Sequence, residues 1–206
     1  MSKIDIQHAF RILRVHPSQW ILLDYHCLGK YFVDTRLPFG LRSSLAIFND
    51  FADTKCWILH YIYLLPDTTH YSDDFLFVSP NGIKRANQIL ATAKTAFEYL
   101  GIPIALDKLE GSTTKLTYLG IEIDSSNFTI NVPDDKYNDI MQELPFWKNR
   151  KKCTKKELLS FIGKLSFICK VVCPGRIFLR RLIDLSTTVS QLHYHINPCS
   201  YHDLGT

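Results

Sequence analysis

The chain has 206 residues, of which 46% are hydrophobic and 21% are charged, a composition typical of a globular protein with one or two small domains. Its apolar stretches are far shorter than the roughly 20 residues of a membrane-spanning helix. The N-terminus lacks the basic segment followed by an apolar segment that is typical of a secretion signal. Six cysteines without a repeated short spacing favour reduced thiols over a disulfide framework. We therefore expect an intracellular protein that binds no membrane, with nucleus and cytoplasm both open.

The net charge of +4 is distributed unevenly along the chain. Between residues 148 and 181, eleven lysines and arginines accompany a single glutamate, a local charge of +10, so the rest of the chain carries −6. Such a segment is either the solvated face of helices or a surface that contacts nucleic-acid phosphates. The size of the excess favours phosphate contacts.

The first part of the sequence predicts a strand, a hairpin and a helix. Residues 3–6 are typical of the end of a strand, and residues 7–15 of a helix or a turn. Residues 20–37 contain two apolar runs around a turn-like segment and predict a hairpin. Apolar residues then recur at helical spacing to about residue 59, with Ser43 or Ser44 as the capping residue.

The middle of the sequence predicts a second hairpin and a second helix. Residues 69–78 are typical of two strands joined by a turn that contains Asp73 and Asp74. An amphipathic helix is expected over residues 84–100, closed by Gly101. Two further strands are expected at residues 102–106 and 115–123.

The last third of the sequence changes character after residue 133. Thr154 and Glu157 have the spacing of a capping box, and an apolar helical face begins at Leu158. A Pro-Gly pair ends this helix, and a second helix is expected over residues 176–185. The pattern as a whole predicts an α+β fold with a domain at 1–133, a basic helical module at 134–190 and a tail at 191–206.

Acidic residues stand at the ends of predicted strands. Asp5 follows the first strand, and Asp73 and Asp74 share a tight turn. Carboxylates held together at one edge of a sheet repel each other unless a hard cation such as Mg²⁺ neutralises them. Two such ions would suit phosphoryl transfer to a hydroxyl group. An Asp-Asp pair taken alone is also common in solvated turns.

Five segments occur in an order that resembles the palm motifs of reverse transcriptases. They are KIDIQHAF at 3–10, LPFGLRSSLAIFN at 37–49, YSDD at 71–74, LGIPIALDK at 100–108 and LTYLGI at 116–121. The later segments ELLSFIGKLSF at 157–167 and GRIFLRRLID at 175–184 resemble the thumb side of DIRS-type retrotransposon enzymes most. The resemblance covers roughly residues 3 to 186.

This resemblance implies a fold, a reaction and partners. The fold would be a polymerase palm, an antiparallel sheet backed by helices, with a residual fingers hairpin at about 20–37 and a small helical thumb. The reaction would be RNA-directed DNA polymerisation with two Mg²⁺ ions, for which Mn²⁺ is a substitute. The partners would be deoxynucleoside triphosphates and a template–primer, either an RNA/DNA hybrid or DNA.

The resemblance also assigns roles to individual residues of the palm. Asp5, Asp73 and Asp74 would bind the metal ions, with the carbonyl of Ile6 as an additional oxygen donor, and Lys108 would donate a proton to pyrophosphate. Phe10 would exclude a 2′-hydroxyl, and the remaining nucleotide contacts would be Phe39, Gly40 and Arg42. Alternative interpretations remain: Phe10 as a core aromatic, Arg42 as a solvated helix-start residue and Lys108 as an ordinary exposed lysine.

The later matched segments would contact nucleic acid. The primer grip would consist of Leu116, Tyr118, Leu119 and Gly120, which also suit a plain buried strand. The phosphate contacts would come from Lys151, Lys152, Lys155, Lys156, Lys164, Arg176, Arg180 and Arg181.

Some features depart from the family pattern. The family usually carries a proline where this chain has Leu45, and Ser72 is unusual before the two aspartates. The chain starts almost on Asp5, so we expect the upstream fingers and a ribonuclease H region to belong to other parts of a parent polyprotein. A catalytically inactive remnant that still binds nucleic acid is the alternative function.

Overall fold

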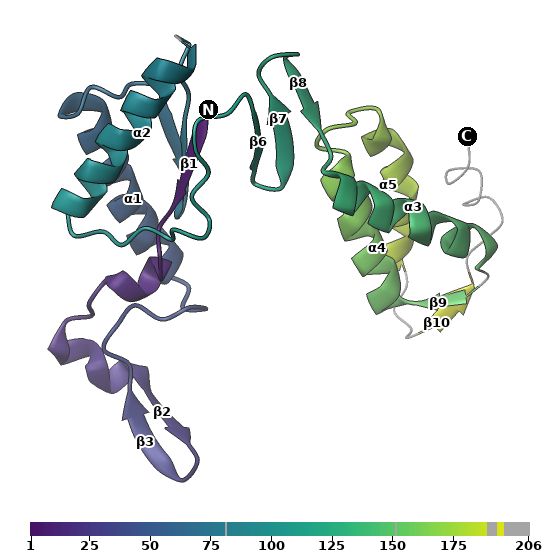
Figure 1. Cartoon of the computed structure of the whole chain (residues 1–206). Helices are drawn as coiled ribbons and strands as arrows, with labels where there is room; N and C mark the ends of the chain where they lie inside the picture. The colour runs from purple at the N-terminus through teal and green to yellow at the C-terminus, as the bar shows by residue number, and fades with distance from the viewer. Residues whose placement is uncertain (81, 151, 189–192, 196–206) are drawn as a thin grey trace. The chain divides into compact units, whose positions relative to one another are not determined.

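The computed structural model describes residues 1–80, 82–150, 152–188 and 193–195 (Figure 1). It consists of two compact units, residues 1–116 and residues 117–206, which we describe one after the other. None of the helices in the described part of the chain is long and apolar enough to cross a membrane.

The first unit is built on a three-stranded antiparallel sheet with the order β1-β5-β4. Its strands are β1 (Ser2–Asp5), β4 (Thr68–Tyr71) and β5 (Asp74–Phe77). Ile4 lies opposite Phe75, and Asp5 lies opposite Asp74. Because neighbouring residues of a strand point to opposite faces, the apolar pair faces the core and the acidic pair lies on the other face. The expected antiparallel sheet is therefore present.

Helices α1 (Ser44–Tyr61) and α2 (Gly82–Tyr99) pack against this sheet and form the core of the unit (Figure 1). Phe75 of the sheet meets Phe97 of α2 edge to face, with 5.2 Å between the ring centroids. Burial of one such side chain stabilises the fold by roughly 1.5–3 kcal/mol. Gly101 ends α2 in the left-handed region at φ 67°, as its position after the apolar pattern predicted.

The start of α1 differs from the expected cap. Ser43 occupies the N-cap position but makes no side-chain hydrogen bond there. The buried Ser44 instead donates its hydroxyl to the carbonyl of Pro38 over 2.7 Å. This bond fastens the loop before α1 to the first turn of the helix.

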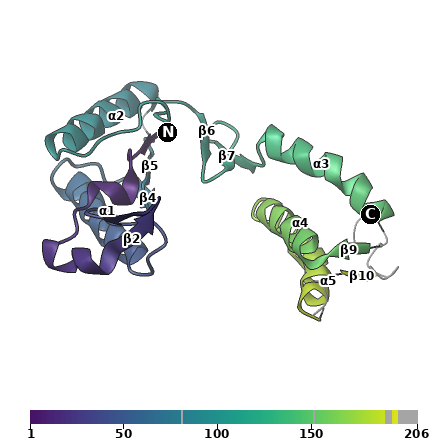
Figure 2. The same cartoon turned by 90° about the horizontal axis from the view of Figure 1, so that it is seen from below.

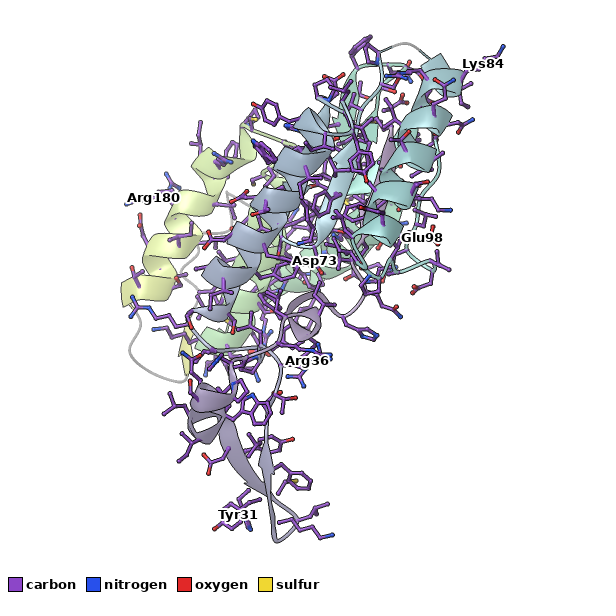
Figure 3. All side chains as sticks on the ribbon, turned by 90° about the vertical axis from the view of Figure 1, so that its left-hand side faces the viewer. Tyr31, Arg36, Asp73, Lys84, Glu98 and Arg180 are labelled. Atoms are coloured by element: carbon purple, nitrogen blue, oxygen red, sulfur yellow. The ribbon has the colours of Figure 1, made fainter. Side chains whose placement is uncertain are left out.

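A hairpin projects from the first unit after the short 3-10 helix η1 (Ala9–Ile12). Its strands are β2 (Asp24–Cys27) and β3 (Lys30–Val33), and Figure 3 shows Tyr31 near the tip and Arg36 near the base. The expectation that residues 20–23 belong to the first strand is wrong, because they end the 3-10 helix η2 (Pro17–Leu23). A run of four apolar residues does not distinguish a strand from a helical turn.

The predicted extents of two other strands are also wrong. Within residues 102–106 only Ile104 takes part in a sheet contact, a single bridge to Ile6. The expected strand at 115–123 is two strands, β6 (Lys115–Tyr118) and β7 (Ile121–Asp124), separated by a turn at Leu119 and Gly120. With β8 (Thr129–Asn131) they form an antiparallel sheet in the order β6-β7-β8.

The second unit contains helices α3 (Asp134–Asn149), α4 (Lys155–Ile168) and α5 (Gly175–Thr188), shown from below in Figure 2. Trp147 of α3 stacks on Phe161 of α4 with 4.5 Å between the ring centroids. The capping box is confirmed: Thr154 Oγ1 accepts from the Glu157 backbone, and Glu157 Oε2 accepts from the Thr154 backbone. Helix α3 lies within the helical module predicted at 134–190, but its bounds were not predicted; it contains Pro145, a residue typical of a helix end.

A short strand pair accompanies these helices. Strand β9 (Lys152–Thr154) precedes α4 and pairs with β10 (His193–His195). The rest of the tail predicted at 191–206 lies outside the described residues. The structure divides the chain into compact units after residue 116. The domain boundary at residue 133 remains a prediction.

Candidate active site

The structure brings Asp5, Asp73 and Asp74 together at one end of the first sheet. Asp5 is the last residue of β1 and lies opposite Asp74, the first residue of β5. Asp73 is in the turn before β5, and its carbonyl accepts a hydrogen bond of 3.1 Å from the backbone of Ile6. This bond fastens the turn to the end of β1, so the three acidic residues come from two segments that support each other.

The electrostatics of this cluster favour a cation. Asp5 is only 6% exposed, and burial raises the pKa of the neighbouring Asp74, which the charges of Asp5 and Asp73 raise further. Lys3 opposes the increase. The two neighbouring carboxylates disfavour the ionised form of Asp74, and a nearby positive charge would favour it.

Lys108 supplies positive charge at this site. Its Nζ lies 3.3 Å from both carboxylate oxygens of Asp5, and this hydrogen bond raises the pKa of the lysine. The loop that carries Lys108 is held to β1, because the Ala105 backbone donates to the Asp5 carbonyl over 2.9 Å. Residues 103 positions apart in the sequence are thereby placed in contact.

The predicted sugar-contacting residue, Phe10, lies in η1 just after the acidic residue of β1. Its ring centroid is 5.0 Å from that of Phe39 and 4.8 Å from that of Phe48. Phe39 is 65% exposed, whereas Phe48 is fully buried in α1. The sequence did not identify Phe48 as a support for Phe10, because its only signal was a place on the apolar face of a helix.

The backbone around these aromatic rings adopts unusual conformations. His8 and Ala9 have positive φ angles of 66° and 37°, so the chain turns sharply between β1 and η1. Gly40 has a φ of 84°, which a residue without a side chain adopts at little cost. Arg42 lies exposed just before α1. Backbone strain of this kind is often concentrated at functional sites.

The donor set of the acidic cluster fits a hard divalent cation. Carboxylate oxygens are the ligands that Mg²⁺ and Mn²⁺ prefer, and the three carboxylate groups lie at the end of β1 and the start of β5. Among the described residues, no group of three histidine, cysteine, aspartate or glutamate side chains already has the placement of a metal site. The carboxylate of Asp5 is engaged with Lys108 instead.

The predicted primer-grip residues lie on β6 and the turn that follows it. Leu116 is buried at the end of the first unit, and Tyr118 belongs to the second. Leu119 and Gly120 form the turn with φ angles of 50° and 76°. A Cβ at position 120 would meet the ammonium end of Lys136, a flexible side chain that can move aside, so the positive φ angle is the main reason for glycine at this turn.

The predicted phosphate contacts differ in their surroundings. Lys152, Lys156, Arg176, Arg180 and Arg181 are exposed, Lys155 is half-buried, and Lys151 lies outside the described residues. Lys164 forms ion pairs with Glu143 and, over 3.6 Å, with Asp139. These acidic partners belong to α3, and the packing of this helix against α4 was not predicted, so the ion pairs of this lysine were not foreseeable.

Comparison with known proteins assigns more than half of the chain to one family. The profile of "Reverse transcriptase (RNA-dependent DNA polymerase)" matches residues 1–123, which include all three acidic residues. The Tf2-3 and Tf2-4 transposon polyproteins of Schizosaccharomyces pombe are each 23% identical over 83% of this chain. The match spans only 12% of the length of these polyproteins.

Solved structures share the fold. The foamy viral protease–reverse transcriptase bound to an RNA/DNA hybrid matches with a TM-score of 0.77 and 20% identity, over 98% of this chain and 26% of that one. The same enzyme type bound to double-stranded DNA matches with a TM-score of 0.71 and 20% identity, over 98% of this chain and 40% of that one. The family profile covers more than half of the sequence, and the chain therefore belongs to the reverse transcriptase (RNA-dependent DNA polymerase) family.

Proposed function

We propose that the chain carries out template-directed transfer of deoxynucleotides to the 3′ hydroxyl of a primer by two-metal phosphoryl transfer. The observation that carries this proposal is the convergence of Asp5, Asp73 and Asp74 at adjacent strand ends within the segment that matches the family. The raised pKa of Asp74 supports the need for added positive charge at this point. Catalysis of phosphoryl transfer depends mainly on such positioning and charge neutralisation.

The three aspartates would hold two Mg²⁺ ions, with the carbonyl of Ile6 as a further donor and Mn²⁺ as a substitute. When bound, the ions would lower the pKa of the primer hydroxyl and stabilise the leaving pyrophosphate. Lys108 would deliver a proton to that pyrophosphate, and its contact with Asp5 supports a place at the reacting groups.

The aromatic residues beside the cluster would select the nucleotide. Phe10 would lie under the sugar of the incoming deoxynucleoside triphosphate, where its ring leaves no space for a 2′-hydroxyl. Its contacts with Phe39 and Phe48 support this role, because a ring held on two sides excludes a small group reliably. Gly40 allows close approach of the backbone to the ligand, and Arg42 would contact the triphosphate.

Template and primer would contact both units. Leu116, Tyr118, Leu119 and Gly120 would hold the primer end, and the exposed cations of β9, α4 and α5 would bind phosphates. The foamy viral relatives with this fold are bound to RNA/DNA hybrid or double-stranded DNA, which supports the same class of partner here.

Two finer assignments complete the proposal. We place the chain nearest the DIRS-type elements because of the segments at 157–167 and 175–184, and we keep the domain boundary at residue 133. The Schizosaccharomyces pombe relatives are polyproteins, which supports a parent polyprotein for this chain. A phylogenetic tree of the polymerase segment in which the chain groups away from DIRS-type sequences would remove that subfamily assignment.

The experiment is primer extension on an RNA template with Mg²⁺ and deoxynucleotides. Asp73→Asn should lower extension at least about 100-fold, because several kcal/mol of transition-state stabilisation depend on the metal ligands. Duplex affinity should stay within about twofold, since affinity comes mainly from phosphate contacts. Asp67→Asn is the matched control, an exposed aspartate just before β4 whose side chain lies outside the cluster. Substantial extension by Asp73→Asn would place the catalytic centre elsewhere.

A second function is binding of nucleic acid without catalysis. It is favoured by the engagement of Asp5 with Lys108 and by the lack of a ready metal site among the described residues. Tight duplex binding by the unmodified chain together with no extension in Mg²⁺ or Mn²⁺ would support this function over the first.

A further inference from the structure

Lys108 occupies a specific position on Asp5. Its ammonium group is 3.3 Å from Oδ1 and 3.3 Å from Oδ2, so it lies between the two oxygens of one carboxylate. The Asp5 side chain is 9% exposed, and that of Lys108 is 59% exposed. The lysine therefore covers the solvent-facing side of a carboxylate that is otherwise enclosed by the protein.

This position conflicts with a bound cation. A divalent ion held by Asp5 would sit about 2.0–2.6 Å from a carboxylate oxygen, on the accessible side of the group. The lysine ammonium already lies on that side, and two cations that share one carboxylate at such distances repel each other strongly. Asp74 faces Asp5 from the neighbouring strand, which leaves the carboxylate little room to turn away.

Only the side chain of Lys108 would have to move to resolve this conflict. The loop backbone is fixed to β1 on both sides of the lysine: Ala105 donates to the Asp5 carbonyl, and Lys3 and Glu110 exchange backbone hydrogen bonds of 3.0 and 3.2 Å. The Lys3 side chain also pairs with Glu110 over 2.8 Å. The long, exposed side chain of Lys108 can swing away while its Cα stays beside the site.

We propose that Lys108 is a built-in counter-ion that neutralises Asp5 until a divalent cation displaces it, an inference that rests on the proposed function. The exchange keeps the buried carboxylate paired at every stage, so the empty site carries less uncompensated charge. It also frees an ammonium group at the moment when the site can accept a triphosphate. Binding of the cation would thus release Lys108 first, and the phosphates of the triphosphate would then attract its ammonium group.

The test measures the reactivity of Lys108 directly. The full chain is treated with an acetylating ester at one pH, with and without Mn²⁺, and the acetylation rate of each lysine is read by mass spectrometry. Binding of Mn²⁺ is followed separately by the electron paramagnetic resonance signal of the free ion. Lys94 is the internal control, because it is an exposed lysine of α2.

Bound Mn²⁺ should raise the acetylation rate of Lys108 about two- to fivefold, the range for release from an exposed ion pair. The rate at Lys94 should stay unchanged. Asp5→Asn should release Lys108 without any metal, and Asp73→Asn should weaken Mn²⁺ binding and remove the metal effect while leaving Lys108 protected.

The contrary outcomes separate this inference from the proposed function. If Mn²⁺ binds at the carboxylates while Lys108 keeps its slow rate, the counter-ion role is wrong and the metal site stands. If Asp5→Asn leaves the rate unchanged, the ion pair does not protect the lysine and the inference fails. If no Mn²⁺ binds through Asp73, both the proposed function and the counter-ion role are wrong.

Discussion

A buried lysine in the core of the first unit has consequences at the scale of a single residue. Lys55 lies on the sheet-facing side of α1 and is 2% exposed. Its ammonium donates to the Phe51 carbonyl over 2.8 Å and lies against the Phe51 ring. Burial lowers the pKa of Lys55 to about 7, so the folded chain binds this proton less tightly than the unfolded chain does.

Lys55→Met should stabilise the first unit, and the gain should depend on pH. The unfolded chain keeps the Lys55 proton up to a pKa near 10.5. Between pH 7 and 10.5 the parent therefore loses a proton on folding, and its stability rises with pH. The gain from the substitution should be about 1–3 kcal/mol at pH 6.5, since one pKa unit corresponds to about 1.4 kcal/mol, and should shrink at pH 9.

Urea denaturation at the two pH values measures this effect. Lys94→Met is the control, because Lys94 is exposed on α2 and its replacement should change stability little at either pH. A gain for Lys55→Met that is equal at pH 6.5 and pH 9 would mean that Lys55 is charged in the folded state throughout.

The capping box of α4 makes a prediction at the scale of an element. Thr154→Ala removes the hydroxyl that accepts the Glu157 backbone N–H and should cost about 1 kcal/mol, whereas Thr154→Ser retains the cap. Faster amide hydrogen exchange over residues 155–168 in the alanine variant alone is the expected measurement. Equal exchange in both variants would show that tertiary packing, and not the cap, sets the start of α4.

The same box has a defined pH dependence. The pKa of Glu157 is lowered to about 2, first by the hydrogen bond from the Thr154 backbone and then by Arg150. Because the pKa in the folded state is below that in the unfolded chain, the stabilisation is complete above about pH 4.5. It should be lost as the pH falls toward 2.

Elements with a strong local signal were predictable from the sequence. The helices α1 and α2, the hairpin around Asp73 and the Thr154–Glu157 box each depend on contacts between residues close in sequence. The bounds of α3 within the predicted helical module were not predicted. Pro145 costs this helix a backbone hydrogen bond, a loss offset by the stacking of Trp147 on Phe161. That offset comes from another helix and leaves no local signal.

The sequence allowed the residues of the candidate site to be predicted, but not the contacts between their side chains. Asp5 and Asp74 alternate with apolar neighbours, so their shared face follows from the strand pattern. The position of Lys108 on Asp5 depends on how a distant loop is fastened to β1, which no spacing reveals. The ion pairs of Lys164 were hidden for the same reason.

At the scale of the whole molecule, the basic residues of the second unit should dominate affinity for nucleic acid. Lys156→Gln with Arg176→Gln should weaken duplex binding and lower the slope of log affinity against log salt by about 0.9 for each phosphate that the protein no longer neutralises. Lys84→Gln with Arg85→Gln is the matched control, two exposed cations at the start of α2 in the first unit. Fluorescence anisotropy over a range of salt concentrations measures both slopes, and equal slopes for the two double variants would contradict the assignment.

The pairing of Asp5 with Asp74 also constrains how the sequence can evolve. If β1 shifted by one residue along β5, its acidic side chain would move to the helix-facing side of the sheet, into an apolar core. An insertion or deletion within β1 would therefore damage folding and chemistry together. Selection for correct folding alone would then preserve the alignment of Asp5 with Asp74, even in a gene copy whose polymerase activity is not under selection.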